Sequence, residues 1–299
     1  MTTIGFVGTG NMGWPMAACL VNKGFTVHVN DSRREVAENF VQQVGGFAPD
    51  SLRQLAAGAD MIVTMLPTSA IVERVLMEGD DNLFAGMKPG TIIIEMSSGV
   101  PSATQKLAEK VAELGGTLID APVSGGVPRA KTGQLAIMVG GDPAAIEKAM
   151  PVLSAMGTSV LRTGAVGSAH AMKALNNLVS TGGFLIGIEA LLIGQRFGLD
   201  PAVMTDVLNA ATGMNNSTQK KFKQFVLSRK FDAGFTMGLL AKDLSIALQV
   251  GRETGTAAPL SALVKEMITA AQARFGDDAD HTEMAKLCEL LAGSELKAG

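Results

Sequence analysis

A glycine-rich turn near the start of the chain, GTGNMG at residues 8–13, constrains the fold more than any other stretch. The apolar run Ile4–Val7 before it is typical of a strand that is buried on both faces of a parallel sheet. The run Met12–Asn22 after it predicts a helix, and Thr26–Asn30 predicts a second strand that leads to Asp31. Strand, turn, helix, strand and acid therefore occur in the order of a dinucleotide-binding unit.

Each glycine of this turn has its own physical reason. Gly8 permits the tight turn, Gly10 lets a pyrophosphate approach the backbone, and Gly13 lets the helix pack on the strand. The helix N-terminus adds unpaired N–H groups and a partial positive charge, which favour phosphates. The alternative is a purely structural turn. The predicted cofactor contacts here are Gly8, Gly10, Asn11, Met12 and Gly13.

Asp31 indicates which dinucleotide is expected. A carboxylate at this position accepts hydrogen bonds from the adenosine ribose hydroxyls and repels a 2′-phosphate, which favours NAD. Arg33 and Arg34 follow closely. They would neutralise a phosphate if they faced it, or point into water as first-turn residues of the next helix. We predict NAD as the cofactor and leave NADP open.

Strands and helices continue to alternate up to residue 163. In an open α/β sheet the ligand lies beyond the carboxyl ends of the strands. Leu66, Pro67 and Ser97 occupy such positions, so we predict that they contact the nicotinamide half, with ordinary loop chemistry as the alternative. The further strands are predicted at Met61–Met65, Ile92–Glu95, Thr117–Asp120, Leu135–Val139 and Ser159–Leu161, and helices at Ser51–Ala57 and Pro101–Leu114.

No strand pattern survives past Gly164. Helices are predicted at 201–210, Asn215–Ser228, Thr236–Thr254, Pro259–Phe275 and Thr282–Leu291, and Asp142 and Asp200 are predicted N-caps because a proline follows each. The predicted fold class is therefore α/β, with a Rossmann-type domain at 1–163 and an all-helical substrate and dimerisation domain at 164–299, joined by a long interdomain helix.

The joining stretch, 164–197, carries the main candidate for chemistry, Lys173. Asn177 lies one helical turn later on the same face, beside Asn176. A helix this apolar must be buried in protein or lipid, and the interruption by Glu189 favours protein. A partly desolvated lysine has a lowered pKa and exchanges protons near neutral pH. The commoner alternative is a lysine whose ammonium reaches the surface. Two amides on a buried face argue against that alternative.

The overall composition excludes several classes of function. With a net charge of −3, the chain has no electrostatic footprint for nucleic acid or an anionic membrane. Its two cysteines are far apart and its three histidines do not converge, so we expect neither a metal site nor a hydrolytic triad. The absence of tyrosine rules out a Tyr–Lys reductase mechanism. No signal peptide is evident, and we expect a cytoplasmic protein.

Four motifs in order resemble the β-hydroxyacid dehydrogenase family, of the 3-hydroxyisobutyrate dehydrogenase and tartronate semialdehyde reductase type. The stretch GFVGTGNMGWPMAACL resembles the family's glycine motif, and DAPVSGG at 120–126 resembles its substrate loop. From residue 164, GAVGSAHAMKALNN resembles its catalytic helix, and Lys242-Asp243-Leu244 its later cofactor-side lysine. The resemblance covers almost the whole chain.

The resemblance implies a role for each motif. Ser124, Gly125 and Gly126 would hold the substrate carboxylate, although the residues alone favour a plain Pro/Gly loop there. Lys173 would be the general acid/base, and Asn177 would hydrogen-bond the reacting oxygen or the lysine. Lys242 would contact the cofactor; its alternative is a surface ion pair. His170, one turn before Lys173, has no predicted role.

We therefore expect an oxidoreductase that transfers hydride between a nicotinamide cofactor and a short 3-hydroxy acid or its semialdehyde. The alternatives are an imine reductase, which would replace the lysine; an NADPH-dependent short semialdehyde or glyoxylate reductase; a 6-phosphogluconate dehydrogenase, which would need a longer helical domain; and a dinucleotide-sensing or structural protein without activity. Large apolar helix faces favour a homodimer or homotetramer.

Overall fold

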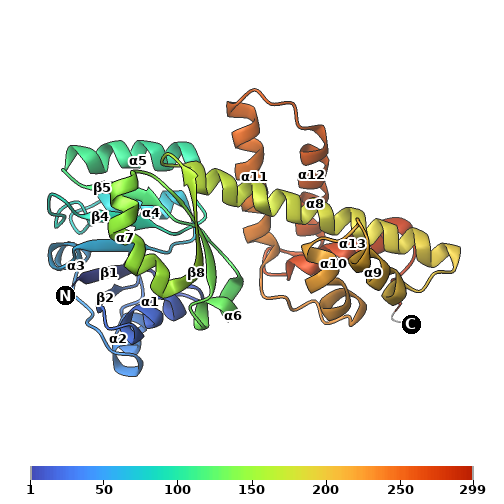
Figure 1. Cartoon of the computed structure of the whole chain (residues 1–299), viewed down its shortest axis with the longest axis horizontal. Coiled ribbons are helices and arrows are strands. Elements are labelled where there is room, and N and C mark those ends of the chain that lie inside the picture. Colours follow the sequence, from blue (N-terminus) through green and yellow to red (C-terminus); the bar gives the residue numbers. More distant parts are fainter. Residues whose placement is uncertain (1, 298–299) are drawn as a thin grey trace. The chain divides into compact units, whose positions relative to one another are not determined.

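The computed structural model describes residues 2–297, and the chain divides into two compact units, Met1–Lys173 and Ala174–Gly299. The first unit is built on an eight-stranded sheet and the second is helical (Figure 1). The division falls inside the long helix α8 (Ser168–Phe197). The predicted fold class, a Rossmann-type α/β domain followed by a helical one, is confirmed.

The sheet of the first unit has the strand order β2-β1-β3-β4-β5-β7-β6, with β8 beside β7. The strands β1 to β5 are parallel, whereas β7 is antiparallel to β5 and β6. The carboxyl ends of β1 to β5 therefore share one edge. The bounds are β1 Thr3–Val7, β2 Thr26–Asn30, β3 Met61–Thr64, β4 Ile92–Glu95, β5 Thr117–Asp120, β6 Val123–Ser124, β7 Leu135–Gly140 and β8 Gly157–Gly164.

Helices cover both faces of this sheet because successive strand side chains point to opposite sides. In β4, Ile92 and Ile94 pack in one apolar cluster with α1, α2 and α7, and Ile93 packs in another with α3, α4 and α5. The bounds are α1 Gly13–Asn22, α2 Arg34–Gln43, α3 Leu52–Gly58, α4 Ser69–Met77, α5 Pro101–Glu113, α6 Gly126–Lys131 and α7 Pro143–Met156. This sandwich fixes the strand ends at which the candidate site residues lie.

In the second unit most predicted helices are confirmed, but one is wrong. Instead of a single polar helix at Asn215–Ser228, α10 ends at Lys220 and a π-helix, η1, follows. The break lets η1 bury Phe222, Val226 and Leu227 in the core. The bounds are α9 Pro201–Ala210, α10 Asn216–Lys220, η1 Phe222–Leu227, α11 Met237–Glu253, α12 Pro259–Phe275, the 3₁₀-helix η2 His281–Glu283, and α13 Met284–Ala292.

The long helix α8 is buried on one side only. Ile188 and Leu191 lie in the core, whereas Ile186 is 63 % exposed and Ile193 is 71 % exposed. The prediction of a buried helix is therefore confirmed for one face. By length and composition alone, α8 is the one helix within residues 2–297 that could cross a membrane, and 44 % of its most apolar window is buried inside protein.

Candidate active site

The glycine turn between β1 and α1 has the geometry of a phosphate-binding loop. Gly8 has a φ of +96°, and a Cβ on Gly13 would lie 1.8 Å from the Gly8 carbonyl oxygen, so the protein itself requires glycine at both positions. A Cβ on Gly10 would meet nothing within 4 Å. The α1 N-terminus has no side-chain cap at Met12. Open space at Gly10 and uncapped N–H groups fit a pyrophosphate.

Asp31, at the end of β2, is fixed beside this turn. Its Oδ2 accepts the Thr9 N–H at 2.9 Å, and its Oδ1 accepts the Arg33 N–H at 3.1 Å. Arg34 does not pair with Asp31; it forms ion pairs with Glu38 and Asp50, which compensate the charge of Arg34. Arg33 Nε lies 3.9 Å from Asp31 Oδ1. A carboxylate at this position fits NAD better than NADP, and binding of the adenosine ribose by Asp31 stays a prediction.

The loops after β3 and β4 are tied together by Ser97. Its hydroxyl accepts the Leu66 N–H at 2.9 Å, and its own N–H donates to Glu95 at 2.9 Å. The Ser97 side chain is fully buried, whereas Leu66 is half-buried and Pro67 exposed. The Ser97 side chain therefore shapes the loop that presents Leu66 and Pro67. A nicotinamide contact from these three residues stays a prediction.

The segment 120–126 begins with a buried carboxylate that anchors α8. Asp120 accepts the N–H of Gly167 at 2.8 Å and the N–H of His170 at 2.9 Å, so it caps the first turn of that helix. Farther along, Gly125 and Gly126 have positive φ values and are exposed, and the Ser124 side chain is half-buried. The end of the segment is thus open to a ligand, while its start is locked.

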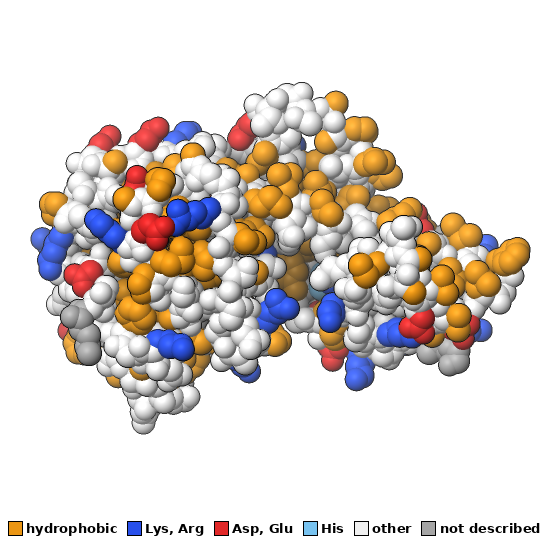
Figure 2. All heavy atoms as spheres, viewed as in Figure 1, with side chains coloured by type: hydrophobic (Ala, Val, Ile, Leu, Met, Phe, Trp, Pro, Cys, Tyr) orange, Lys and Arg blue, Asp and Glu red, His pale blue; other side chains and the backbone are white. Residues whose placement is uncertain are grey.

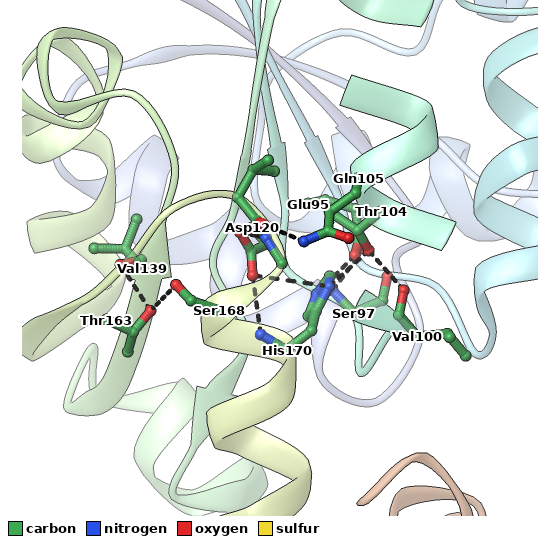
Figure 3. Close-up of polar contacts among 12 residues, drawn as sticks. Glu95, Ser97, Val100, Thr104, Gln105, Asp120, Val139, Thr163, Ser168 and His170 are labelled. Carbon is green, nitrogen blue, oxygen red and sulfur yellow. Dashed lines mark hydrogen bonds and ion pairs between the residues drawn. The ribbon is translucent and has the colours of Figure 1, made fainter. Parts of the chain in front are cut away.

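His170 occupies a fully buried polar network that the sequence did not predict (Figure 3). Its Nε2 lies 2.8 Å from Glu95 Oε2 at the end of β4, and its Nδ1 lies 2.8 Å from Thr104 Oγ1 on α5. Burial opposes both charges, but their mutual attraction outweighs it: the pKa of Glu95 is lowered and the pKa of His170 is raised. Burial raises the pKa of Asp120. Glu95 and His170 therefore form a buried pair of opposite charges.

Lys173 lies one turn after His170 on α8 and is partly buried. Asn177, a turn later, donates from Nδ2 to Asp243 Oδ2 at 2.6 Å, and Asp243 is only 2 % exposed. Lys242 Nζ lies 3.4 Å from the other oxygen of Asp243. Within the second unit, a buried carboxylate thus holds both Asn177 and Lys242, a function of Asp243 that the sequence did not predict.

These features define a class: a nicotinamide-dependent oxidoreductase with a Rossmann-type domain, in which a lysine-bearing helix is anchored to the strand ends. Comparison with known proteins agrees. Residues 3–165 match the model described as the NAD-binding domain of 6-phosphogluconate dehydrogenase, and residues 167–288 match the one described as NAD-binding of NADP-dependent 3-hydroxyisobutyrate dehydrogenase. The chain belongs to the β-hydroxyacid dehydrogenase family that includes 3-hydroxyisobutyrate dehydrogenase.

Three similar proteins illustrate the relationship. The chain is 36 % identical over 296 residues to 2-(hydroxymethyl)glutarate dehydrogenase of Eubacterium barkeri, covering 99 % of this chain and 98 % of that one. It is 37 % identical over 289 residues to 3-hydroxyisobutyrate dehydrogenase of Pseudomonas aeruginosa, covering 94 % and 95 %. The structure of Mycobacterium tuberculosis 3-hydroxyisobutyrate dehydrogenase with L-serine superposes with a TM-score of 0.89 at 31 % identity, covering 96 % and 99 %. This chain is thus an NAD(P)-dependent hydroxyacid dehydrogenase.

Proposed function

We propose that the enzyme oxidises a short 3-hydroxy acid to its semialdehyde and catalyses the reverse reduction, with Lys173 as the general acid/base. The observation that carries the proposal is the anchoring of α8. Asp120 and Glu95 hold its first turn at the ends of β5 and β4, one turn before Lys173. The amino group is therefore presented by a helix fixed to the same strand ends from which the Ser97 and Ser124 loops start.

The residues of this chain supply binding, orientation and a proton. The nicotinamide, when bound, supplies the hydride acceptor or donor. In oxidation, neutral Lys173 takes the proton of the substrate hydroxyl; in reduction, its ammonium protonates the oxygen that gains negative charge. Ser124, Gly125 and Gly126 bind the substrate carboxylate. Asn177, held by Asp243, hydrogen-bonds the reacting oxygen or Lys173.

The cofactor contacts follow from the same arrangement. In this proposal the glycine turn binds the pyrophosphate and Asp31 binds the adenosine ribose. Leu66, Pro67 and Lys242 contact other parts of the dinucleotide. We also propose that the protein is a homodimer or homotetramer located in the cytoplasm. The substrate is small, because one short molecule must present both a carboxylate and the reacting carbon.

Steady-state oxidation of a panel of acids, with NAD and NADP in separate series, tests the proposal. The panel contains 3-hydroxyisobutyrate, glycerate, L-serine and 2-(hydroxymethyl)glutarate. We expect turnover of at least one 3-hydroxy acid, with the higher kcat/KM for NAD. Binding of NADH without turnover of any acid or semialdehyde would favour a dinucleotide-binding protein instead. Reduction of cyclic imines alone would favour an imine reductase.

A further inference from the structure

The last residues of three neighbouring strands form a polar row at the carboxyl edge of the sheet. Thr64 of β3 is in register with Glu95 of β4, and Glu95 is in register with Asp120 of β5. Residues in register on parallel strands point to the same face, so the two carboxylates are neighbours. Glu95 is 2 % exposed and Asp120 is 0 % exposed. Two buried negative charges at neighbouring positions are unfavourable unless a cation pairs with them.

His170, in the first turn of α8, supplies that cation. Its Nε2 lies 2.8 Å from Glu95 Oε2, and its main-chain N–H donates to Asp120 Oδ2 at 2.9 Å (Figure 3). The Thr104 hydroxyl donates its one hydrogen to the Val100 carbonyl at 3.1 Å, so it accepts a hydrogen bond from His170 Nδ1 at 2.8 Å. Both ring nitrogens therefore face acceptors and carry protons, and the imidazole is positively charged.

Glu95 also holds the loop that follows β4. Its Oε1 accepts the Ser97 N–H at 2.9 Å, and Ser97 Oγ accepts the Leu66 N–H at 2.9 Å. One carboxylate thus joins α8, through Oε2, to the loop that we predict to contact the nicotinamide, through Oε1. These contacts all lie within the first unit, which includes Lys173. A shift of His170 against Glu95 would therefore move the start of the helix relative to that loop.

The ion pair between Glu95 and His170 is closely enclosed. A Cβ on Gly99 would lie 2.9 Å from His170 Cε1 and 3.2 Å from Glu95 Oε2. Gly99 does not have a positive φ, so the space beside the ion pair, and not the backbone conformation, requires glycine there. The imidazole is therefore confined to one orientation.

Stability alone does not explain a buried ion pair at this place. Apolar side chains of similar volume are often at least as stabilising as a buried pair of charges. What the ion pair adds is direction. Asp120 holds the main-chain N–H groups of Gly167 and His170, which fixes the position of the helix start. The imidazole contact with Glu95 is made away from the helix axis, so it also resists rotation of the helix.

We infer that His170 is a positioning residue for Lys173: its ion pair with Glu95 sets the rotation of α8 about its axis. The inference rests on the proposed function, in which Lys173 is the general acid/base. Lys173 follows His170 by three residues, so it lies one helical turn farther on the same face. A helix with its side chains has a radius of about 6 Å, so a rotation of about 10° moves a side-chain end by about 1 Å. Such a displacement of a reacting group lowers the rate about 100-fold.

Two glycine variants separate positioning from general destabilisation. Gly99→Ala crowds the ion pair and removes neither partner. The matched control is Gly116→Ala, at a buried glycine just before β5 and at the opposite end of that strand from Asp120. A Cβ on Gly116 would lie 3.0 Å from the Thr91 carbonyl oxygen, which is comparable crowding.

We expect both glycine variants to lower the Tm, and only Gly99→Ala to lower kcat, by about 10- to 100-fold. The deuterium isotope effect on hydride transfer should rise in Gly99→Ala, because the chemical step becomes slower relative to product release. The Kd for NADH should stay unchanged in both variants, since the glycine turn and Asp31 are untouched.

Two substitutions of the histidine identify the contact that positions the helix. In His170→Gln the amide nitrogen takes the place of Nε2 beside Glu95, whereas in His170→Asn it takes the place of Nδ1 beside Thr104. We expect kcat to fall in both variants, and about 10-fold further in His170→Asn, because only His170→Gln keeps a donor toward Glu95.

A wild-type kcat in Gly99→Ala, or equal losses of kcat in Gly99→Ala and Gly116→Ala, would overturn the inference and show a merely structural network. A smaller loss in His170→Asn than in His170→Gln would overturn it as well. If the histidine variants do not fold, the glycine pair decides. Absence of turnover in the wild type, or ordinary turnover by Lys173→Met, would instead contradict the proposed function, so the two failures are distinguishable.

Discussion

At the scale of single residues, we predict that Asp31 selects the cofactor through its charge. Asp31→Asn keeps an acceptor for the Thr9 N–H but removes the repulsion of a 2′-phosphate. We expect the ratio of kcat/KM for NAD to that for NADP to fall at least about 10-fold, mainly because NADP improves. Asp80→Asn, at an exposed carboxylate, is the control. An unchanged ratio in Asp31→Asn would assign cofactor choice to other residues.

His281 makes the stability of the protein dependent on pH. Burial and the charge of Lys221 lower its folded pKa to about 4, below the ordinary value of 6.5. Below pH 6.5 the unfolded chain binds a proton that the folded protein refuses, so stability falls as the pH drops toward 4, by at most about 1.4 kcal/mol per pH unit. Urea unfolding across this range should show a shallower pH dependence for His281→Gln than for the wild type. Parallel curves would contradict this assignment.

At the scale of elements, the turn between β1 and α1 offers a matched pair of glycine variants. Gly13→Ala places a Cβ 1.8 Å from a carbonyl oxygen, so it should lower the Tm and abolish NADH binding. Gly10→Ala meets no protein atom within 4 Å, so the Tm should stay unchanged while the Kd for NADH rises at least about 10-fold. NADH fluorescence titration and thermal unfolding check both. Tight binding by Gly10→Ala would show that no ligand approaches the backbone there.

Elements with strong local signals could be predicted from the sequence. The strands β2, β4 and β5 have the predicted bounds, and Asp142 and Asp200 cap their helices as the following prolines indicate. The break at Lys221 could not be predicted, because the burial of η1 depends on packing against distant helices. The helix α4 was missed although Thr68 caps it.

The candidate site divides in the same way. The glycine turn and the pair Lys173 and Asn177 follow from spacing within one element. The network around His170 does not, because β4, α5, β5 and α8 each contribute one part of it. The Asn177–Asp243 hydrogen bond likewise joins residues 66 positions apart. The sequence does show an acidic residue at the end of β4 and of β5, Glu95 and Asp120, which indicates a buried polar site. Their partners depend on tertiary packing and could not be predicted.

At the scale of the whole molecule, exposed apolar side chains on the second unit predict self-association. They gather over the C-terminal end of α8 and over α12 (Figure 2), and include Ile193, Phe197, Leu260 and Leu263. We expect light scattering to give a dimer or tetramer of the 30.9 kDa chain. Ile193→Glu should shift it toward the monomer, whereas Lys148→Glu, at an exposed residue of α7, should not. A wild-type monomer would contradict this prediction.

Proton transfer by Lys173 is the step on which the proposed activity depends most. The most direct measurement is therefore kcat of Lys173→Met beside its Kd for NADH, with Lys148→Met as an exposed control. Loss of a general acid/base lowers kcat about 100- to 10,000-fold, and we predict that loss with a Kd and Tm close to those of the wild type. Ordinary turnover by Lys173→Met with its cofactor bound would contradict the proposed mechanism.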